Sequence, residues 1–204
     1  MDRSEFARTV RTFLPAYLSA QEYREVIKQL EDYPHIRDIY WVTGSSHSPD
    51  QVLQGDAWSG VTVRDVETGA TKKVRAIIIS NSCDIDPDNK GRPFRRISVV
   101  PLIKLSKFER LLLEHYTEGS VRDKLEGIRN QKHSDILYFP PPEGVAEERI
   151  AVLDDVHSMS IEGFNSEKNE LDFRLNNAGF YVLLLKLSIH FTRIQESVNR
   201  SSLA

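Results

Sequence analysis

The chain has 204 residues, a formal net charge of −3 and 40% hydrophobic residues. This length fits one domain with appended elements, and the hydrophobic fraction is enough for a sizeable core. A sequence pI near 6.1 excludes a global basic field, so contact with a nucleic acid requires a local basic patch.

The cysteine count and the hydropathy pattern exclude further classes. One cysteine cannot form an internal disulfide, and the common structural zinc spacings need more than one. No apolar segment follows Met1, and the longest apolar run, 180–185, is far shorter than the ~20 residues of a membrane span. We therefore expect a cytoplasmic protein with no membrane partner.

Helical signals occupy the first forty residues. A helix is expected from Ser4 to Leu14, and Ser19-Ala20-Gln21-Glu22 is a capping box that begins a second helix. The second helix should end near Tyr33, because Pro34 disfavours helical geometry in the residue before it. Residues 1–50 are therefore predicted to form an N-terminal helical segment that ends in a loop.

From Val61 the hydrophobic pattern has a period of two, which indicates a strand. This strand leads into a hairpin turn at Glu67-Thr68-Gly69-Ala70 and returns through Val74 to the apolar run 76–79. That run is apolar on both faces, so it is predicted to be a central strand. A further strand is expected at 97–102.

Helical signals return after Leu105. Capping residues at Ser106 and Ser120 predict two helices inserted within residues 106–131. Short strands are expected at 136–139, 150–153 and 172–175, and a closing helix at 178–198 with Asn176-Asn177 as its cap. Apolar residues surround most of that helix, so it should pack on the sheet and also on the N-terminal helices or a second chain. The predicted β domain spans 51–155, and 156–204 supply the last strand and helix.

Three short motifs stand at strand ends: Gly55-Asp56-Ala57-Trp58, Ser80-Asn81 and Val100-Pro101. Together they resemble the MazF/PemK-type toxins, small SH3-like barrels that cleave RNA in bacterial toxin–antitoxin pairs. The likeness covers residues 54–105. It implies an α+β fold in which an SH3-like β-barrel is elaborated with N-terminal, inserted and C-terminal helices.

In that family RNA cleavage uses no metal or other cofactor. It needs an Arg just ahead of the central strand and a hydroxyl residue after the Val-Pro strand end, and Arg75 stands at the first position. The second position reads Leu102-Ile103-Lys104 and lacks a hydroxyl, so Ser82, Asp84 or His47 would have to substitute. Arg75, Ser82 and Asp84 are the catalytic candidates, expected at one end of the barrel together with a nearby basic cluster. The alternative for Arg75 is an exposed strand-end charge.

That basic cluster follows the central strand and consists of Lys90, Arg92, Phe94, Arg95 and Arg96. Its cations predict contacts with an RNA backbone, and its aromatic ring can stack on a base. The simpler alternative is compensation of the acidic residues in the same loop.

Those acidic residues, Asp84, Asp86 and Asp88, invite comparison with a calcium loop. The calcium pattern fails, because Asn89 stands where glycine is needed and Arg95 where a bidentate glutamate is needed. A solvated turn is therefore expected, and a weak divalent-cation site is the alternative. Cys83, between an apolar strand and a carboxylate, is expected to be buried and unreactive.

These observations predict a divergent MazF/PemK-like barrel that binds RNA or a partner protein without catalysis. The expected setting is bacterial toxin–antitoxin or phage defence, with an antitoxin or a defence-system subunit as the protein partner. One alternative is an active metal-independent endoribonuclease. Another is a structural assembly subunit that forms a homodimer or larger oligomer through its C-terminal helix.

Overall fold

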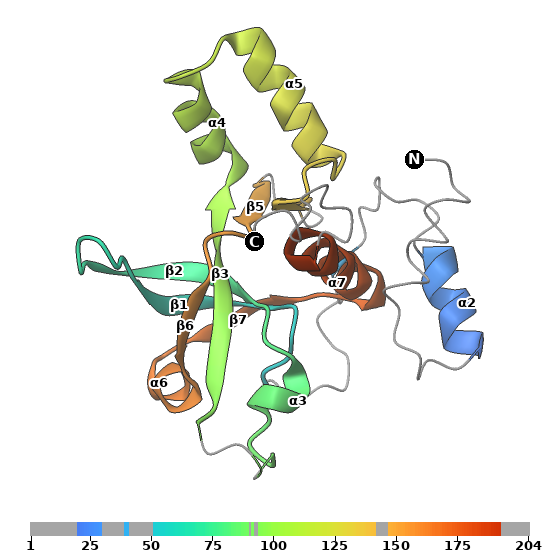
Figure 1. Ribbon diagram of the computed structural model, residues 1–204, viewed down its shortest axis with the longest axis vertical. Coiled ribbons are helices and arrows are strands. Elements are labelled where there is room, and N and C mark those ends of the chain that lie inside the picture. The colour runs from blue at the N-terminus through green and yellow to red at the C-terminus, as the bar shows by residue number, and fades with distance from the viewer. Residues whose placement is uncertain are drawn as a thin grey trace, which may run out of the picture.

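The computed structural model describes residues 20–29, 39–40, 51–89, 91, 94–141 and 147–192. They form an α+β fold around a seven-stranded antiparallel sheet (Figure 1). Its strands are β1 (Asp56–Arg64), β2 (Thr71–Ile78), β3 (Arg96–Lys104), β4 (Ile136–Phe139), β5 (Arg149–Val152), β6 (His157–Ser160) and β7 (Glu170–Arg174). The helices are α2 (Ala20–Gln29), α3 (Ser82–Ile85), α4 (Leu105–Leu113), α5 (Glu118–Arg129), α6 (Ile161–Ser166) and α7 (Asn177–Thr192).

The hairpin of β1 and β2 forms where the alternating pattern and the turn residues predict it. The Asp65 carboxylate accepts a hydrogen bond from the backbone N–H of Thr68 at 2.8 Å. Gly69 supplies a φ of +72°, a conformation that glycine adopts without a steric penalty. The three predicted strands at 61–66, 74–79 and 97–102 belong to one sheet, as expected.

Strand β3 is longer than the Val-Pro motif predicts. It continues through Pro101 to Lys104, pairing with β6 over residues 96–99 and with β5 over residues 102–104. On this edge Pro101 lies in the gap between the two ladders. A residue without a backbone N–H is tolerated at such a break.

The predicted barrel is not closed. The strand order β4-β5-β3-β2-β1-β7 has two ends, and no ladder joins β4 to β7 among the described residues. Side chains fill the interval instead: Phe139 of β4 and Phe173 of β7 have ring centroids 5.8 Å apart. Tyr40 forms an isolated antiparallel β-bridge with Leu175, and its hydroxyl donates a hydrogen bond to the Pro140 carbonyl. Burial raises the pKa of Tyr40 and so preserves this donor.

Helix starts differ from the predicted caps. Helix α4 begins directly at Leu105, with Lys104 at the N-cap and no side-chain hydrogen bond. The backbone N–H of Leu105 donates to the Glu148 carbonyl, so the predicted cap Ser106 lies inside the first turn. Helix α5 is capped by Thr117, whose hydroxyl accepts from the Ser120 N–H. The predicted helix at 4–14 and the cap Ser19 lie outside the described residues.

Helix α7 covers one face of the sheet and α6 the other. Val182, Leu183 and Leu185 of α7 join a core cluster with residues from several strands, and Ile27 of α2 packs against it. The predicted burial of this helix on the sheet and on an N-terminal helix is therefore confirmed. Its predicted continuation to residue 198 lies outside the described residues. None of the described helices is long and apolar enough to cross a membrane.

A buried lysine ties α7 to the loop after α5. Lys186 is 2% exposed, and its Nζ donates to the backbone carbonyls of Gln131, His133 and Ile136. Burial lowers the pKa of Lys186 to about 8, while nearby Asp135 opposes this effect. A lysine was not expected in the interior of this helix, because its aliphatic neighbours dominate the pattern.

Because the pKa of Lys186 is lowered, the free energy of unfolding should change with pH in the alkaline range. Above pH 8 the unfolded chain binds the Lys186 proton more tightly than the folded chain does, so this group's contribution to stability rises with pH. We expect the free energy of unfolding of the wild type, relative to Lys186→Met, to rise by about 3 kcal/mol between pH 8 and pH 10.5. Urea titrations at several pH values measure this difference, and a constant difference would contradict the prediction.

Gly55 has the positive φ that its position at a turn predicts, +87°. A Cβ placed there would lie 3.3 Å from Leu175 Cδ1. Gly55→Ala should therefore lower the free energy of unfolding by about 1–3 kcal/mol. Gly119→Ala is the matched control, because Gly119 lies in α5 and a Cβ placed there would have no atom within 4 Å. The control should be neutral or slightly stabilising. Equal melting temperatures for the two variants would contradict the claim that the backbone at Gly55 requires glycine.

Candidate anion-binding site

Two β-bulges flank Arg75. In the β1–β2 ladder Trp58 pairs with Ala76 and Val61 with Val74, so Ser59 and Gly60 together oppose the single Arg75. In the β1–β7 ladder Ala57 pairs with Phe173 and Trp58 with Leu171, which makes Asp172 the extra residue. Bulges of this kind redirect side chains and are frequent beside functional sites. Gly60 has a φ of +83°, and a glycine inside a strand pattern is the sequence feature that could have located the first bulge.

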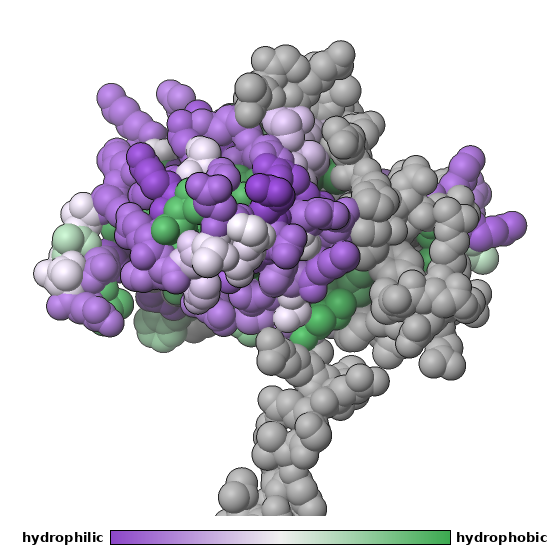
Figure 2. Space-filling model, turned by 90° about the horizontal axis from the view of Figure 1, so that it is seen from above, coloured by the Kyte–Doolittle hydropathy of each residue, from purple (hydrophilic) through white to green (hydrophobic). Residues whose placement is uncertain are grey.

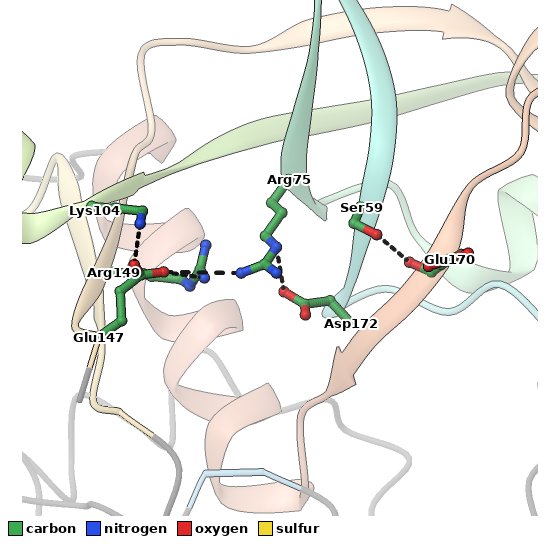
Figure 3. Close-up of polar contacts among 7 residues, drawn as sticks. All are labelled: Ser59, Arg75, Lys104, Glu147, Arg149, Glu170 and Asp172. Atoms are coloured by element: carbon green, nitrogen blue, oxygen red, sulfur yellow. Dashed lines mark hydrogen bonds and ion pairs between the residues drawn. The ribbon is translucent and has the colours of Figure 1, made fainter. Parts of the chain in front are cut away.

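The resemblance implies that Arg75 stands just ahead of a central strand. In the structure Arg75 lies within β2. Figure 3 shows its guanidinium between two carboxylates. Nε is 3.4 Å from Asp172 Oδ2, and Nη1 is 3.9 Å from Glu147 Oε2. Both distances exceed those of good hydrogen bonds. Arg75 is therefore held by charge, and 42% of its side chain is exposed, so that its N–H donors can be reached by a ligand.

Glu147 forms ion pairs with two further cations. Lys104 Nζ contacts Glu147 Oε1, and an Arg149 guanidinium nitrogen contacts Oε2. Lys104 comes from the end of β3 and Arg149 from the start of β5, two residues that are paired in register. Three cations from three strands thus converge on one carboxylate (Figure 3). We call Arg75, Lys104 and Arg149 the cation cluster.

The cation cluster lies on the face of the sheet that α7 covers further along. Arg75 stands two residues before Ile77, Lys104 two after Leu102, and Arg149 two before Ala151, and these three apolar residues belong to the core under α7. Alternate residues of a strand share a face. Lys73 extends this face toward the hairpin, which points away from α7 in Figure 1.

Other arginines of the fold are bound differently. Arg174 donates two hydrogen bonds of 2.7 Å to Asp56, whose side chain is fully buried. Arg129 donates two of 2.7 Å to Glu148, which also accepts from Tyr138. Such bidentate pairs hold elements together. Arg75 makes no such pair within the described residues, which distinguishes it from the structural arginines.

The other two predicted catalytic residues, Ser82 and Asp84, lie in or at the start of α3, where local hydrogen bonds hold the chain. The Ser82 hydroxyl accepts from the Gln54 N–H at 2.9 Å and so ties α3 to the start of β1. Asp84 lies in α3, whose cap Asn81 accepts from the Cys83 N–H. Ser82 and Asp84 follow the end of β2, seven and nine residues after Arg75. The contacts described for Arg75 are with Glu147 and Asp172, and they do not include Ser82 or Asp84.

The predicted basic cluster is only partly within the described residues, because Lys90 and Arg92 lie outside them. Arg95 donates to the Asp86 carbonyl at 3.0 Å and lies 3.6 Å from Glu162. Arg96 donates to Ser158 of β6. Both arginines therefore brace their loop against the fold. Phe94 is 89% exposed and stays a candidate for stacking.

Cys83 is exposed, so the prediction of a buried thiol is wrong. The strand ends at Ile78 and α3 starts at Ser82, which turns Cys83 outward while Ile85 points into the core. Among the described residues no group of three or more His, Cys, Asp or Glu side chains is arranged to hold a metal ion.

The face of the molecule seen from the α4–α5 end is mainly hydrophilic. Figure 2 shows small hydrophobic areas separated by polar side chains on the described part of that face. Recognition on this face is therefore expected to depend on charge more than on apolar contact.

Comparison of the chain with protein-family models and with curated proteins gives no match.

Two adjacent glutamates have different roles, and mutation separates them. The pKa of Glu148 is held below its ordinary value of 4.5, mainly by the hydrogen bonds from Arg129. The stability that this carboxylate contributes is therefore present above pH 4.5 and lost as the pH falls through the lowered pKa. We expect Glu148→Gln to cost about 1–3 kcal/mol at pH 7, and the difference from wild type to shrink on acidification.

Glu147→Gln is the matched control, since its partly exposed ion pairs should contribute about 1 kcal/mol or less. Urea unfolding at pH 7 and at acidic pH measures both variants. Equal losses would contradict the assignment of Glu148 as the structural residue and Glu147 as the site residue.

Proposed function

We propose that this chain is an RNA-binding module that holds the phosphate backbone of a single strand on the cation cluster. The observation that carries the proposal is the convergence of Arg75, Lys104 and Arg149 on one carboxylate. Guanidinium and ammonium groups so arranged suit a phosphate, which accepts charge-assisted hydrogen bonds from several donors.

The resemblance to MazF/PemK-type toxins also supports the cation cluster as the RNA-binding surface. It draws attention to Arg75 and to the residues after Val100-Pro101, and Lys104 from the second position meets Arg75 at Glu147. Lys73, next on the same face of β2, extends the positive charge by about 6–7 Å along the strand. Such a row follows a backbone without reading its bases.

Binding without cleavage is favoured by the position of Ile103. This residue replaces the hydroxyl that the resemblance calls for, and its side chain packs against the core formed by α4, α5 and β4. It can neither donate nor accept a proton. The bacterial toxin–antitoxin or phage-defence setting, and a protein partner from it, rest on the resemblance of residues 54–105.

A second candidate is metal-independent RNA cleavage. Arg75 stands between Glu147 and Asp172, and two carboxylates beside a cation can supply general acid and base groups. Incubation of RNA with the protein and analysis of the ends separates the candidates. Fragments that end in 2′,3′-cyclic phosphate indicate the endoribonuclease, whereas retention of intact RNA indicates the binding module.

Arg75→Ala should weaken binding of single-stranded RNA by about three- to tenfold and lower the salt dependence by about one phosphate contact. Fluorescence anisotropy with a labelled strand of about 16 nucleotides measures this. Arg122→Ala is the matched control, because it removes the same charge from the exposed side of α5. The same affinity for wild type and Arg75→Ala across a salt titration would exclude RNA binding by the cluster.

A further inference from the structure

We infer that Glu147 is an internal competitor for the anion site: its carboxylate occupies the place of a phosphate and must leave before a ligand binds. This inference rests on the proposed RNA-binding function and adds its regulation. It predicts that the wild-type chain binds more weakly than its cations alone would allow.

The contacts of Glu147 resemble those of a bound anion. One carboxylate oxygen contacts Lys104, and the other contacts Arg149 and lies 3.9 Å from Arg75. Within the described residues the ion pairs of this side chain are with three cations. A carboxylate and a phosphate both present pairs of anionic oxygens to such donors, so they compete for the same positions.

The two adjacent glutamates differ in how firmly they are bound. Glu148 performs the structural task, clamping α5 to the start of β5 through Arg129 and Tyr138. Glu147 is 28% exposed as a side chain, and two of its three partners, Arg75 and Lys104, are more exposed still. Partly exposed ion pairs of this kind contribute little to stability. We therefore expect the chain to fold without the Glu147 carboxylate.

Displacement of Glu147 changes the charge that a ligand meets. The three cations, Glu147 and Asp172 together carry a net charge of +1. Without Glu147 the same group carries +2. Because Glu147 is covalently tethered beside the cluster, its effective concentration there is high, and a ligand must outcompete it.

The test compares RNA affinity and salt dependence of the wild type, Glu147→Gln, Arg75→Ala and the double variant. Glu126→Gln, on the exposed side of α5, controls for the loss of one negative charge. We expect Glu147→Gln to bind about tenfold more tightly, since one unit charge close to the ligand is worth about that factor. The control should match wild type, and Arg75→Ala should reduce the gain. Glu147→Ala serves as a second variant, and thermal melting checks that each is folded.

The outcomes separate this inference from the function on which it rests. If wild type binds, Arg75→Ala weakens binding and Glu147→Gln gives no gain, the internal competitor is refuted and the RNA-binding function stands. A gain that is equal with and without Arg75, or shared by Glu126→Gln, shows a general charge effect and also refutes it. If neither wild type nor Glu147→Gln binds RNA, both proposals fail.

Discussion

The buried ion pair of Asp56 and Arg174 is the constraint on which the rest of the fold depends. Asp56 is fully buried, accepts both hydrogen bonds from Arg174 and also accepts from the Leu53 N–H. Removal of one partner from such a pair costs about 3–5 kcal/mol, a large part of a domain's stability. The pair fixes β7 against β1 and so determines where α7, which follows β7 directly, meets the sheet.

The same strand then links structure to site. Arg174 is structural, and Asp172, two residues earlier, is the extra residue of the bulge and contacts Arg75. The bulge also explains the packing on both sides of it. Leu171 faces the core that contains Trp58, whereas Phe173 faces the core under α7, although residues two apart in a regular strand share a face.

Much of the sheet could be predicted from the sequence, because its strands follow local periodicity. The hairpin at 65–70 and the apolar run before Ile79 needed no information from distant residues. Strand β6 was missed, since His157 and its polar neighbours lack an apolar alternation. The site was only half visible. Arg75 was identified by resemblance, but Glu147 acquires its role from the pairing of Lys104 with Arg149 and from a bulge beside Arg75, which no local pattern encodes.

The bulge at Asp172 has a consequence for how this sequence can change length. Deletion of one residue from β7 would restore regular pairing with β1, and this is normally the less strained arrangement. Here it would turn either Leu171 or Phe173 to the wrong side of the sheet and withdraw the carboxylate from Arg75. We therefore expect substitutions to accumulate in β7 more readily than single-residue deletions, with the spacing between Leu171 and Arg174 kept constant.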